Sequence, residues 1–293
     1  MVNKPLTLFT DLLTGTCGNP YQQAPDMIQA QKTEASDGKA INHAARTKGE
    51  SVTDEELAAR LADGAGRLLL ELRQTRFLEG RTLGVVGDKV ANAFILTTLR
   101  EWRPRDPILS EESPDSAERL GSERVWIIDP LDGTREYSEH RGDWAVHVAL
   151  AIGGRPVLGA VAVPAKGALY RSDRCAAPKP SRRTRPLMLV SRTRPPAEVE
   201  EIAALLDAEL LPMGSAGAKA MAVVAGEADL YYHAGGQYEW DNCAPAAVAL
   251  GAGLHATRVD GSPLVYNQAD TLMPDLLISR PELAEQVVAH CHR

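Results

Sequence analysis

The chain has 293 residues, of which 44% are hydrophobic, and it carries a formal net charge of −7 at pH 7. This length provides for one large domain or two ordinary ones, and the acidic balance argues against a nucleic-acid-binding surface, which requires a basic face. The sequence has no run of about 18 apolar residues that could cross a membrane. Its four cysteines form no CxxC pair and its start has no apolar leader, so we expect reduced thiols in a cytoplasmic protein.

Residues 1–52 are polar and show no hydrophobic period, so we expect a poorly ordered extension with at most a short turn between Leu6 and Leu13. Regular structure is expected to begin at Thr53, which forms a capping-box pattern with Glu56. Apolar residues at helical spacing then predict two helices, the second over residues 88–102. The predicted apolar faces are Leu57, Leu61, Leu68, Leu69 and Leu72 in the first helix and Val90, Phe94, Ile95 and Leu99 in the second.

Four short apolar runs follow the helices, and each is typical of a β-strand. They are Arg124–Asp129, Trp144–Ile152, Leu158–Val163 and Ala168–Arg171. Because short turns separate these runs, we expect an antiparallel meander that packs on the two helices. Residues 53–175 are therefore predicted to form one α+β half of the protein.

Residues 176–186 contain three prolines and four basic residues, a composition typical of a linker, although a basic clamp on bound phosphate groups is the alternative. From residue 187 to residue 293 strands and helices alternate, which predicts an α/β half. The predicted strands are Leu187–Val190, Leu210–Met213, Leu230–His233, a strand near His255, and Leu276–Ser279. The predicted helices are Pro196–Asp207, Gly217–Gly226, Asp241–Gly251 and Pro281–His290.

The most informative stretch is Trp-Ile-Ile-Asp-Pro-Leu-Asp-Gly-Thr at residues 126–134. It predicts a short apolar strand that ends in two carboxylates, Asp129 and Asp132, followed at once by Gly133 and Thr134. Pro130 stiffens the exit from the strand by fixing φ, and Gly133 can adopt a positive φ or let a ligand approach the backbone. The pattern therefore combines ligands for a hard cation with free backbone amides, which suits a bound metal and a bound phosphate group.

Two further acidic elements support a metal site, namely Glu111-Glu112 and Trp240-Asp241. Converging carboxylates of Glu111, Asp129, Asp132 and Asp241 would repel one another strongly without a cation. An all-oxygen ligand set, completed by the Leu131 carbonyl, favours Mg²⁺ or Mn²⁺ over Zn²⁺ or Cu²⁺.

Taken singly, each of these motifs has a plainer interpretation as a surface turn, an exposed loop or a helix N-cap. Their order along the chain, each at the end of an element, favours a metal-dependent phosphatase instead. Bound cations would also reconcile an acidic chain with a phosphorylated substrate. The histidines, including His147 in the middle of a predicted strand, form no metal-ligand pattern and are assigned no role.

At these residues the chain resembles the inositol monophosphatase superfamily of Mg²⁺-dependent, lithium-sensitive phosphatases. The family pattern of Gly/Ser-Glu-Glu, Asp-Pro-Ile/Leu-Asp-Gly-Thr and Trp-Asp is matched at residues 110–112, 129–134 and 240–241. The resemblance implies the sugar-phosphatase fold, an α/β layered sandwich in which the active site lies between an antiparallel-sheet half and an α/β half. Within the superfamily the chain most resembles CysQ-type 3'(2'),5'-bisphosphate nucleotidases of the actinobacterial kind, on residues 132–137, 143–150, 191–192 and 214–219.

The resemblance implies two or three bound Mg²⁺ ions, which Mn²⁺ can replace. Glu111, Asp129 and the Leu131 carbonyl would hold the first ion. Asp129, Asp132 and Asp241 would hold the second, and Glu111 would help to hold a third.

For catalysis the resemblance implies that Thr134 and Asp88 activate the attacking water. A helix that begins at Asp88 would give this residue the alternative role of a plain N-cap.

The resemblance also implies a substrate-binding set, which consists of Gly133, Thr134, Ser191, Arg192, Gly214, Ser215, Lys219 and Glu239. Gly133 and Thr134 would bind the phosphate that is cleaved, and Glu239 the substrate hydroxyls. Lys219 has the alternative of an exposed helix lysine, and Arg192 that of a surface arginine rather than a bidentate phosphate ligand.

The implied reaction is hydrolysis of the 3'-phosphate of 3'-phosphoadenosine 5'-phosphate by direct attack of water, with 3'-phosphoadenylyl sulfate as a second substrate and a role in sulfur assimilation. The alternatives are an inositol-1-phosphate or fructose-1,6-bisphosphate phosphatase, and a non-catalytic metal- or nucleotide-binding regulator on the same fold. The expected partner is a small phosphorylated nucleotide or sugar, with no nucleic acid polymer and no membrane. Homodimers are common in the family, and the sequence leaves the oligomeric state open.

Overall fold

The computed structural model describes residues 52–292, and these form one compact unit. The expectations for residues 1–51, including the turn between Leu6 and Leu13, lie outside the described residues. The unit begins with two long helices, α2 (Asp54–Gln74) and α3 (Gly80–Trp102). Helix α2 starts as predicted, because the Thr53 hydroxyl accepts a hydrogen bond of 3.3 Å from the Glu56 amide. In the part of the chain described, no helix is long and apolar enough to cross a membrane.

Helix α3 begins eight residues earlier than the sequence predicted. Asp88 therefore lies in the middle of the helix, is 6% exposed, and is not an N-cap. The sequence did not predict this start because the first turns contain glycines, and glycine is a poor helix former. The predicted apolar faces are also wrong at two positions, since Leu68 of α2 is 39% exposed and Val90 of α3 is 38% exposed.

The first sheet has five strands in the order β1-β2-β3-β4-β5. They are β1 (Ile108–Ser110), β2 (Arg124–Asp132), β3 (Ala145–Ile152), β4 (Arg155–Val163) and β5 (Ala168–Arg171). Strands β2 to β5 pair antiparallel as predicted, whereas β1, which pairs parallel with β2, was not predicted from the sequence. A short helix that was also missed, α4 (Thr134–Ser138), follows β2 directly.

The second sheet has the order β7-β6-β8-β10-β9. Its strands are β6 (Leu187–Ser191), β7 (Glu209–Met213), β8 (Leu230–Tyr238), β9 (His255–Thr257) and β10 (Leu272–Ser279). The helices among them are α5 (Val199–Leu206), α6 (Ala216–Val224), α7 (Glu239–Gly251) and α8 (Pro281–Cys291). Each predicted element of this part exists, with bounds that differ mainly at the ends and in the longer β8 and β10.

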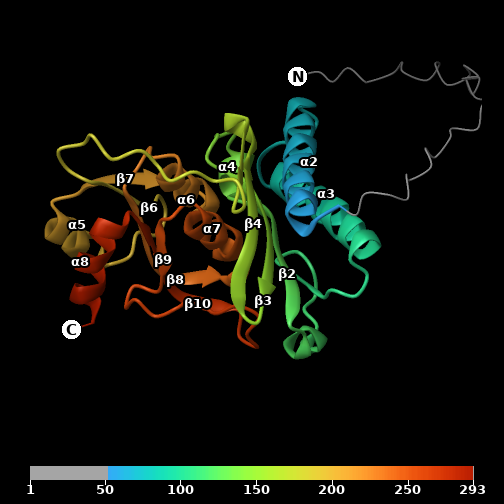
Figure 1. The fold of residues 1–293 in the computed structure, drawn as a ribbon. Helices are drawn as coiled ribbons and strands as arrows, with labels where there is room; N and C mark the ends of the chain where they lie inside the picture. The colour runs from blue at the N-terminus through green and yellow to red at the C-terminus, as the bar shows by residue number, and fades with distance from the viewer. Residues whose placement is uncertain (1–51, 293) are drawn as a thin grey trace, which may run out of the picture. The chain divides into compact units, whose positions relative to one another are not determined.

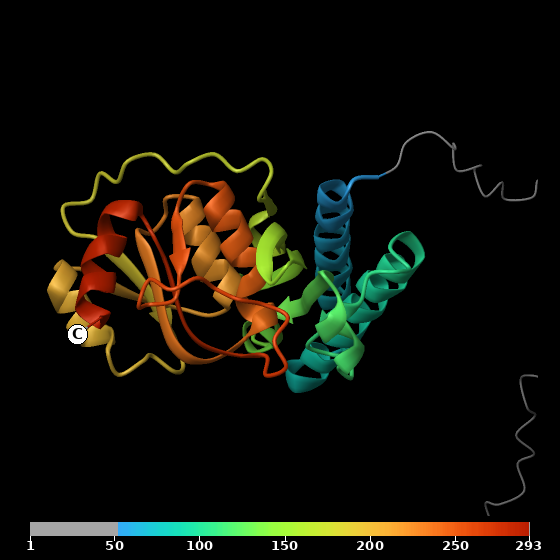
Figure 2. The same ribbon diagram turned by 60° about the horizontal axis from the view of Figure 1, so that its bottom comes forward.

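The described elements stack as five layers, which Figures 1 and 2 show from two directions. Alternate residues of β2 face opposite layers, as the period of two in a strand requires. Trp126 packs with α2 and α3, whereas Val125 packs in the central core with α6 and α7. The second sheet shares that central core through Tyr231, and its other face packs on α5 and α8. The order is therefore α2/α3, first sheet, α6/α7, second sheet, α5/α8.

Candidate active site

The two carboxylates of the central motif lie where β2 leaves its sheet. The pairing of β2 with β3 is irregular between Asp129 and Asp132, and the Leu131 amide donates a hydrogen bond of 3.0 Å to Asp129 Oδ1. Gly133 then turns the chain with φ 87° and ψ 44°, a left-handed conformation that favours glycine. The strand end, the bulge and the turn together fix Asp129 and Asp132 ahead of Thr134.

Asp132 is held by the first turn of α6. Its carboxylate accepts hydrogen bonds from the Ser215 hydroxyl, from the Ala216 amide at 3.1 Å and from the Gly217 amide at 2.6 Å. Nε2 of His147 lies 3.3 Å from Asp132 Oδ2. Burial alone would raise the pKa of Asp132, but His147 and these donors hold it at about 2. Asp132 is thus kept ionised and oriented.

Asp241 comes to the same place from the start of α7, where its Oδ2 accepts a hydrogen bond of 2.6 Å from the Tyr238 amide. Oxygen atoms of Asp129, Asp132 and Asp241 all lie within 4.8 Å of one another. Burial and the charge of Asp132 raise the pKa of Asp241 to about 6. Three acidic side chains are therefore gathered at one place, with His147 as the basic side chain that faces Asp132.

Asp129 shows most clearly that this cluster suits a cation. It is 1% exposed, and its Oδ2 has no hydrogen-bond partner among the described residues. Burial, followed by the charges of Glu111, Asp132 and Asp241, raises the pKa of Asp129 well above its usual value. An orphaned buried oxygen within an all-oxygen donor set fits a hard divalent cation such as Mg²⁺.

Glu111 follows β1 and is brought to the cluster by the parallel pairing of β1 with β2. Ser110 lies opposite Ile128, and the Glu111 amide donates a hydrogen bond of 3.3 Å to the Ile128 carbonyl. The Glu111 carboxyl interacts with Asp129, and its pKa is raised to about 7 by loss of hydration and by the charge of Asp241. The structure thus brings all four predicted carboxylates to one region.

Thr134 and Asp88 meet at the edge of this cluster. The Thr134 hydroxyl lies 3.1 Å from the Leu131 carbonyl and 3.5 Å from Asp88 Oδ1. Burial, followed by the charges of Glu112 and Glu111, raises the pKa of Asp88 to about 8. Asp88 reaches Thr134 from the middle of α3 because Gly84, one turn earlier, lets this helix approach α4. A Cβ on Gly84 would lie 2.7 Å from Thr134 Cγ2.

A pocket opens from these residues toward the second sheet. Its lining includes Gly133, Thr134, Ser191, Arg192, Gly214, Ser215, Lys219, Tyr231, His233 and Asp241. Ser215 precedes α6 with a positive φ of 48°, an unusual conformation for a residue other than glycine. Most of the predicted substrate-binding residues are therefore brought together here.

Lys219 is not the exposed helix lysine that the sequence allowed. It is 4% exposed, and its ammonium group donates hydrogen bonds to the carbonyls of Ser215 at 2.6 Å and Gly214 at 3.2 Å. Burial lowers the pKa of Lys219 to about 8, even though Asp132 and Glu136 oppose that shift. Lys219 thus stabilises the turn before α6 and adds positive charge to the pocket wall.

Glu239 is the predicted substrate-binding residue that the structure does not bring to the pocket lining. It is fully buried, and its two carboxylate oxygens accept hydrogen bonds of 2.7 Å from the amides of Asn267 and Gln268. In contrast, sequence reasoning missed His147, whose Nδ1 lies 3.0 Å from the Trp240 carbonyl and whose Nε2 faces Asp132. Only the register of β3, which pairs His147 with Asp129, could have indicated this position.

The family model described as the inositol monophosphatase family matches residues 54–293. The chain belongs to this family. It is 49% identical over 257 residues to a protein of Mycobacterium leprae named 3'-phosphoadenosine 5'-phosphate phosphatase, with 83% of this chain and 95% of the relative covered. It is 52% identical over 231 residues to a protein of the same name from Mycobacterium bovis, with 75% and 86% covered.

Solved structures of the inositol monophosphatase family share the fold. The crystal structure of CysQ from Bacteroides thetaiotaomicron, described as a bacterial member of this family, matches with a TM-score of 0.68 and 26% sequence identity. The match covers 78% of this chain and 97% of that one. The predicted α/β layered sandwich is confirmed, and family membership makes the protein a metal-dependent phosphatase.

Proposed function

We propose that this phosphatase uses Mg²⁺ to hydrolyse the 3'-phosphate of 3'-phosphoadenosine 5'-phosphate, with 3'-phosphoadenylyl sulfate as a second substrate. The observation that carries the proposal is a group of carboxylates, two of them buried, beside the Gly133–Thr134 turn, at the mouth of a pocket with basic side chains in its wall. Two relatives are named as phosphatases of this nucleotide and are about 50% identical to this chain over most of its length. They support the choice of substrate. An inositol or fructose phosphate is the alternative to be tested.

Glu111, Asp129, Asp132, Asp241 and the Leu131 carbonyl would hold two or three divalent cations, Mg²⁺ or Mn²⁺. Such cations supply charge neutralisation for the attacking and leaving oxygens and a lowered pKa for bound water.

The residues of the chain supply proton transfer and phosphate binding. The Thr134 hydroxyl would orient the attacking water and pass a proton to Asp88, whose raised pKa suits a general base near neutral pH. The amides of Gly133 and Thr134 donate no hydrogen bond within the described chain and would bind the phosphate oxygens. Because phosphoryl transfer depends mainly on positioning and charge stabilisation, these roles complete the proposed site.

The rest of the nucleotide would occupy the pocket toward the second sheet. Ser191, Gly214, Ser215 and Lys219 line it, and the positive charge that Lys219 adds suits a substrate with a second phosphate. Glu239 is left out of this proposal, because its carboxylate is fully engaged by backbone amides.

The test is Mg²⁺-dependent phosphate release, with kcat/KM compared for 3'-phosphoadenosine 5'-phosphate, inositol 1-phosphate and fructose 1,6-bisphosphate. We expect a strong preference for the nucleotide. A preference for either sugar phosphate would keep the metal site and overturn the substrate. If none of the three releases phosphate, a non-catalytic regulator becomes the better hypothesis.

A further inference from the structure

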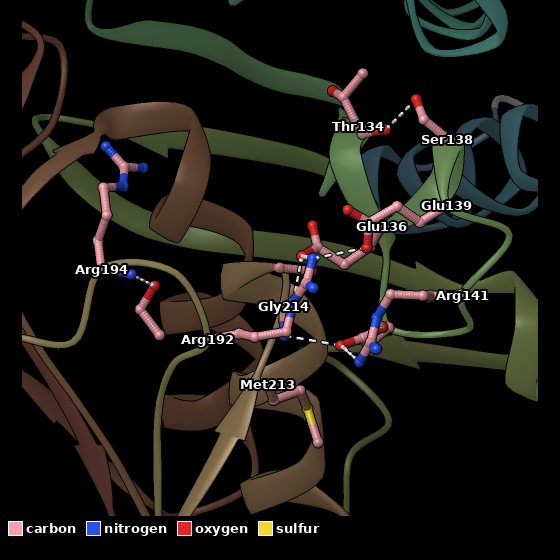
Figure 3. Close-up of polar contacts among 12 residues, drawn as sticks. Thr134, Glu136, Ser138, Glu139, Arg141, Arg192, Arg194, Met213 and Gly214 are labelled. Atoms are coloured by element: carbon pink, nitrogen blue, oxygen red, sulfur yellow. Dashed lines mark hydrogen bonds and ion pairs between the residues drawn. The ribbon is translucent and has the colours of Figure 1, made fainter. Parts of the chain in front are cut away.

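Arg192 lines the pocket, but its guanidinium group contacts the carboxylates of two glutamates of this chain. It follows β6, and its amide donates a hydrogen bond of 3.1 Å to the Met213 carbonyl. Its Nη2 lies 2.7 Å from Glu136 Oε1 and 3.0 Å from Glu139 Oε2, and its Nε lies 3.2 Å from Glu136 Oε1. Figure 3 shows Arg192 reaching toward the two glutamates of the α4 segment, whereas Arg194 points away from them.

Glu136 is the centre of this contact. Its side chain is 8% exposed, compared with 45% for Glu139, so the pair with Glu136 is the better protected from solvent. Glu136 also lies two residues after Thr134, in the single turn of helix that follows Gly133. A displacement of the Glu136 carboxylate would therefore also displace the Gly133–Thr134 turn, which is proposed to bind the phosphate.

The same carboxylate packs against the turn that precedes α6. A Cβ on Gly214 would lie 2.2 Å from Glu136 Cγ, so only glycine fits between the two turns. The next residue, Ser215, donates the hydroxyl hydrogen bond to Asp132. Glu136 thus connects the Gly133–Thr134 turn to the turn that orients a metal ligand.

A second ion pair, between Arg141 and Asp143, also joins these two segments. Asp143 Oδ2 accepts a hydrogen bond of 2.8 Å from the Gly214 amide, and Arg141 binds both oxygens of Asp143 at 2.7 and 2.8 Å. The Arg141 amide in turn donates a 2.9 Å hydrogen bond to the Glu136 carbonyl. The two pairs hold the α4 segment and the Gly214–Ser215 turn together, although they come from parts of the chain about 75 residues apart.

We propose that Arg192 is a positioning residue, which acts through Glu136 to hold the Gly133–Thr134 turn and the Gly214–Ser215 turn in register, and does not bind the substrate itself. The inference rests on the proposed phosphatase function and changes the role that the resemblance implied for Arg192. A guanidinium already committed to two carboxylates has less to offer a phosphate than a free one. Its contribution is orientation, which affects the rate more than the affinity.

The test uses Arg192→Ala, Arg192→Lys, Glu136→Gln and the double variant Arg192→Ala/Glu136→Gln. Arg185→Ala is the matched control, because Arg185 precedes the other end of β6 and its contacts, with the side chains of Asp207 and Glu209 and with the Asp207 carbonyl, are exposed. Two substrates are compared, 3'-phosphoadenosine 5'-phosphate and 4-nitrophenyl phosphate, which has no nucleotide and no second phosphate. Circular dichroism and thermal melting identify any variant that fails to fold, and Arg192→Lys then carries the test.

We expect Arg192→Ala to lower kcat about 10- to 100-fold on both substrates while KM stays within about threefold, since misplacement of reacting groups reduces rate. The double variant is expected to be no slower than the slower single variant, because both changes break one contact. Arg192→Lys, which keeps the charge but loses the two-nitrogen contact with Glu136, is expected to recover part of kcat.

A rise in KM for the nucleotide alone, with 4-nitrophenyl phosphate unaffected, would make Arg192 a substrate contact and overturn the inference. Additive losses in the double variant, or unchanged kinetics of Arg192→Ala, would overturn it as well. Failure of the proposed function is distinguishable, because the unmodified protein itself would then release no phosphate from 3'-phosphoadenosine 5'-phosphate.

Discussion

Gly217→Ala adds one carbon atom and should disturb the proposed metal site. The added Cβ would lie 2.0 Å from His147 Nε2 and 3.0 Å from Ala145 Cβ, whereas ordinary contacts begin at 3.4 Å. His147 or the start of α6 must therefore move by 3.4 − 2.0, or about 1.4 Å. The Gly217 amide and His147 both contact Asp132, so either movement displaces this carboxylate.

Two magnitudes follow from that displacement. Overpacking of this kind destabilises a protein by about 1–3 kcal/mol, which for a domain of this size lowers Tm by roughly 2–12 °C. A displacement of about 1 Å in a group that positions the reaction lowers the rate about 100-fold. We also expect a higher Mg²⁺ concentration for half-maximal activity.

The assay is phosphate release from 3'-phosphoadenosine 5'-phosphate as a function of Mg²⁺ concentration, combined with thermal melting. Gly121→Ala is the control, because a Cβ there meets no atom within 4 Å. Replacing His147 by serine in the Gly217→Ala background should recover part of the lost Tm, since it removes the clashing ring. If Gly217→Ala has the Mg²⁺ dependence and kcat of the unmodified protein, then the contact of Asp132 with His147 and α6 does not control the site.

Three further predictions concern the carboxylates and their cations. Asp132→Asn should abolish phosphate release and leave the circular dichroism spectrum unchanged; a variant with unimpaired turnover would contradict the metal assignment. Protein stripped with EDTA should lose stability as pH rises from about 4 to about 8, because Asp88, Glu111 and Asp241 have pKa values of about 8, 7 and 6 in the folded state, above their unfolded values. These groups contribute stability below pH 4 that is lost as they ionise. Added Mg²⁺ should therefore raise Tm more at pH 8 than at pH 5. An equal rise in Tm at both pH values would refute the reasoning. Lithium should inhibit phosphate release by competing for a magnesium position, and saturating lithium without effect would count against it.

The sequence predicted the antiparallel-sheet half, the α/β half and the acidic motifs because these depend on local patterns, whereas the layered sandwich followed from the family resemblance. The unbroken apolar run at the start of β2 indicates a buried strand, and the motif that ends it contains both carboxylates and the glycine turn. Those features need no knowledge of distant partners. The predicted start of α3 was wrong because it depends on contacts with distant residues. In isolation, Gly84 and Gly87 look like helix breakers. A Cβ on Gly87 would lie 3.0 Å from Tyr137, so this glycine serves close packing between helices.

Other features of the site depend on register or tertiary pairing, which one sequence does not contain. His147 is one apolar-strand position among several until β3 is paired with β2. Arg192 and Glu136 are 56 residues apart and show no pattern that joins them. Glu239 stands beside Trp240-Asp241 in sequence, yet the first turn of α7 directs it toward the 267–268 backbone. Adjacency along the chain therefore does not determine the direction in which a neighbouring side chain points.

The close approach of α7 to β4 has a consequence for the cooperativity of folding. A Cβ on Gly159 would lie 2.4 Å from the Ala244 carbonyl, so the helix backbone rests directly on the strand, and α7 also packs in the core shared with the second sheet. Separating the two sheets would expose the face of this helix that packs on one of them. Amides of α7 should therefore exchange with solvent only when the whole unit unfolds. Asp241 lies in the first turn of this helix, so the proposed metal site is expected to exist complete or not at all, with no partly folded form that still binds cations.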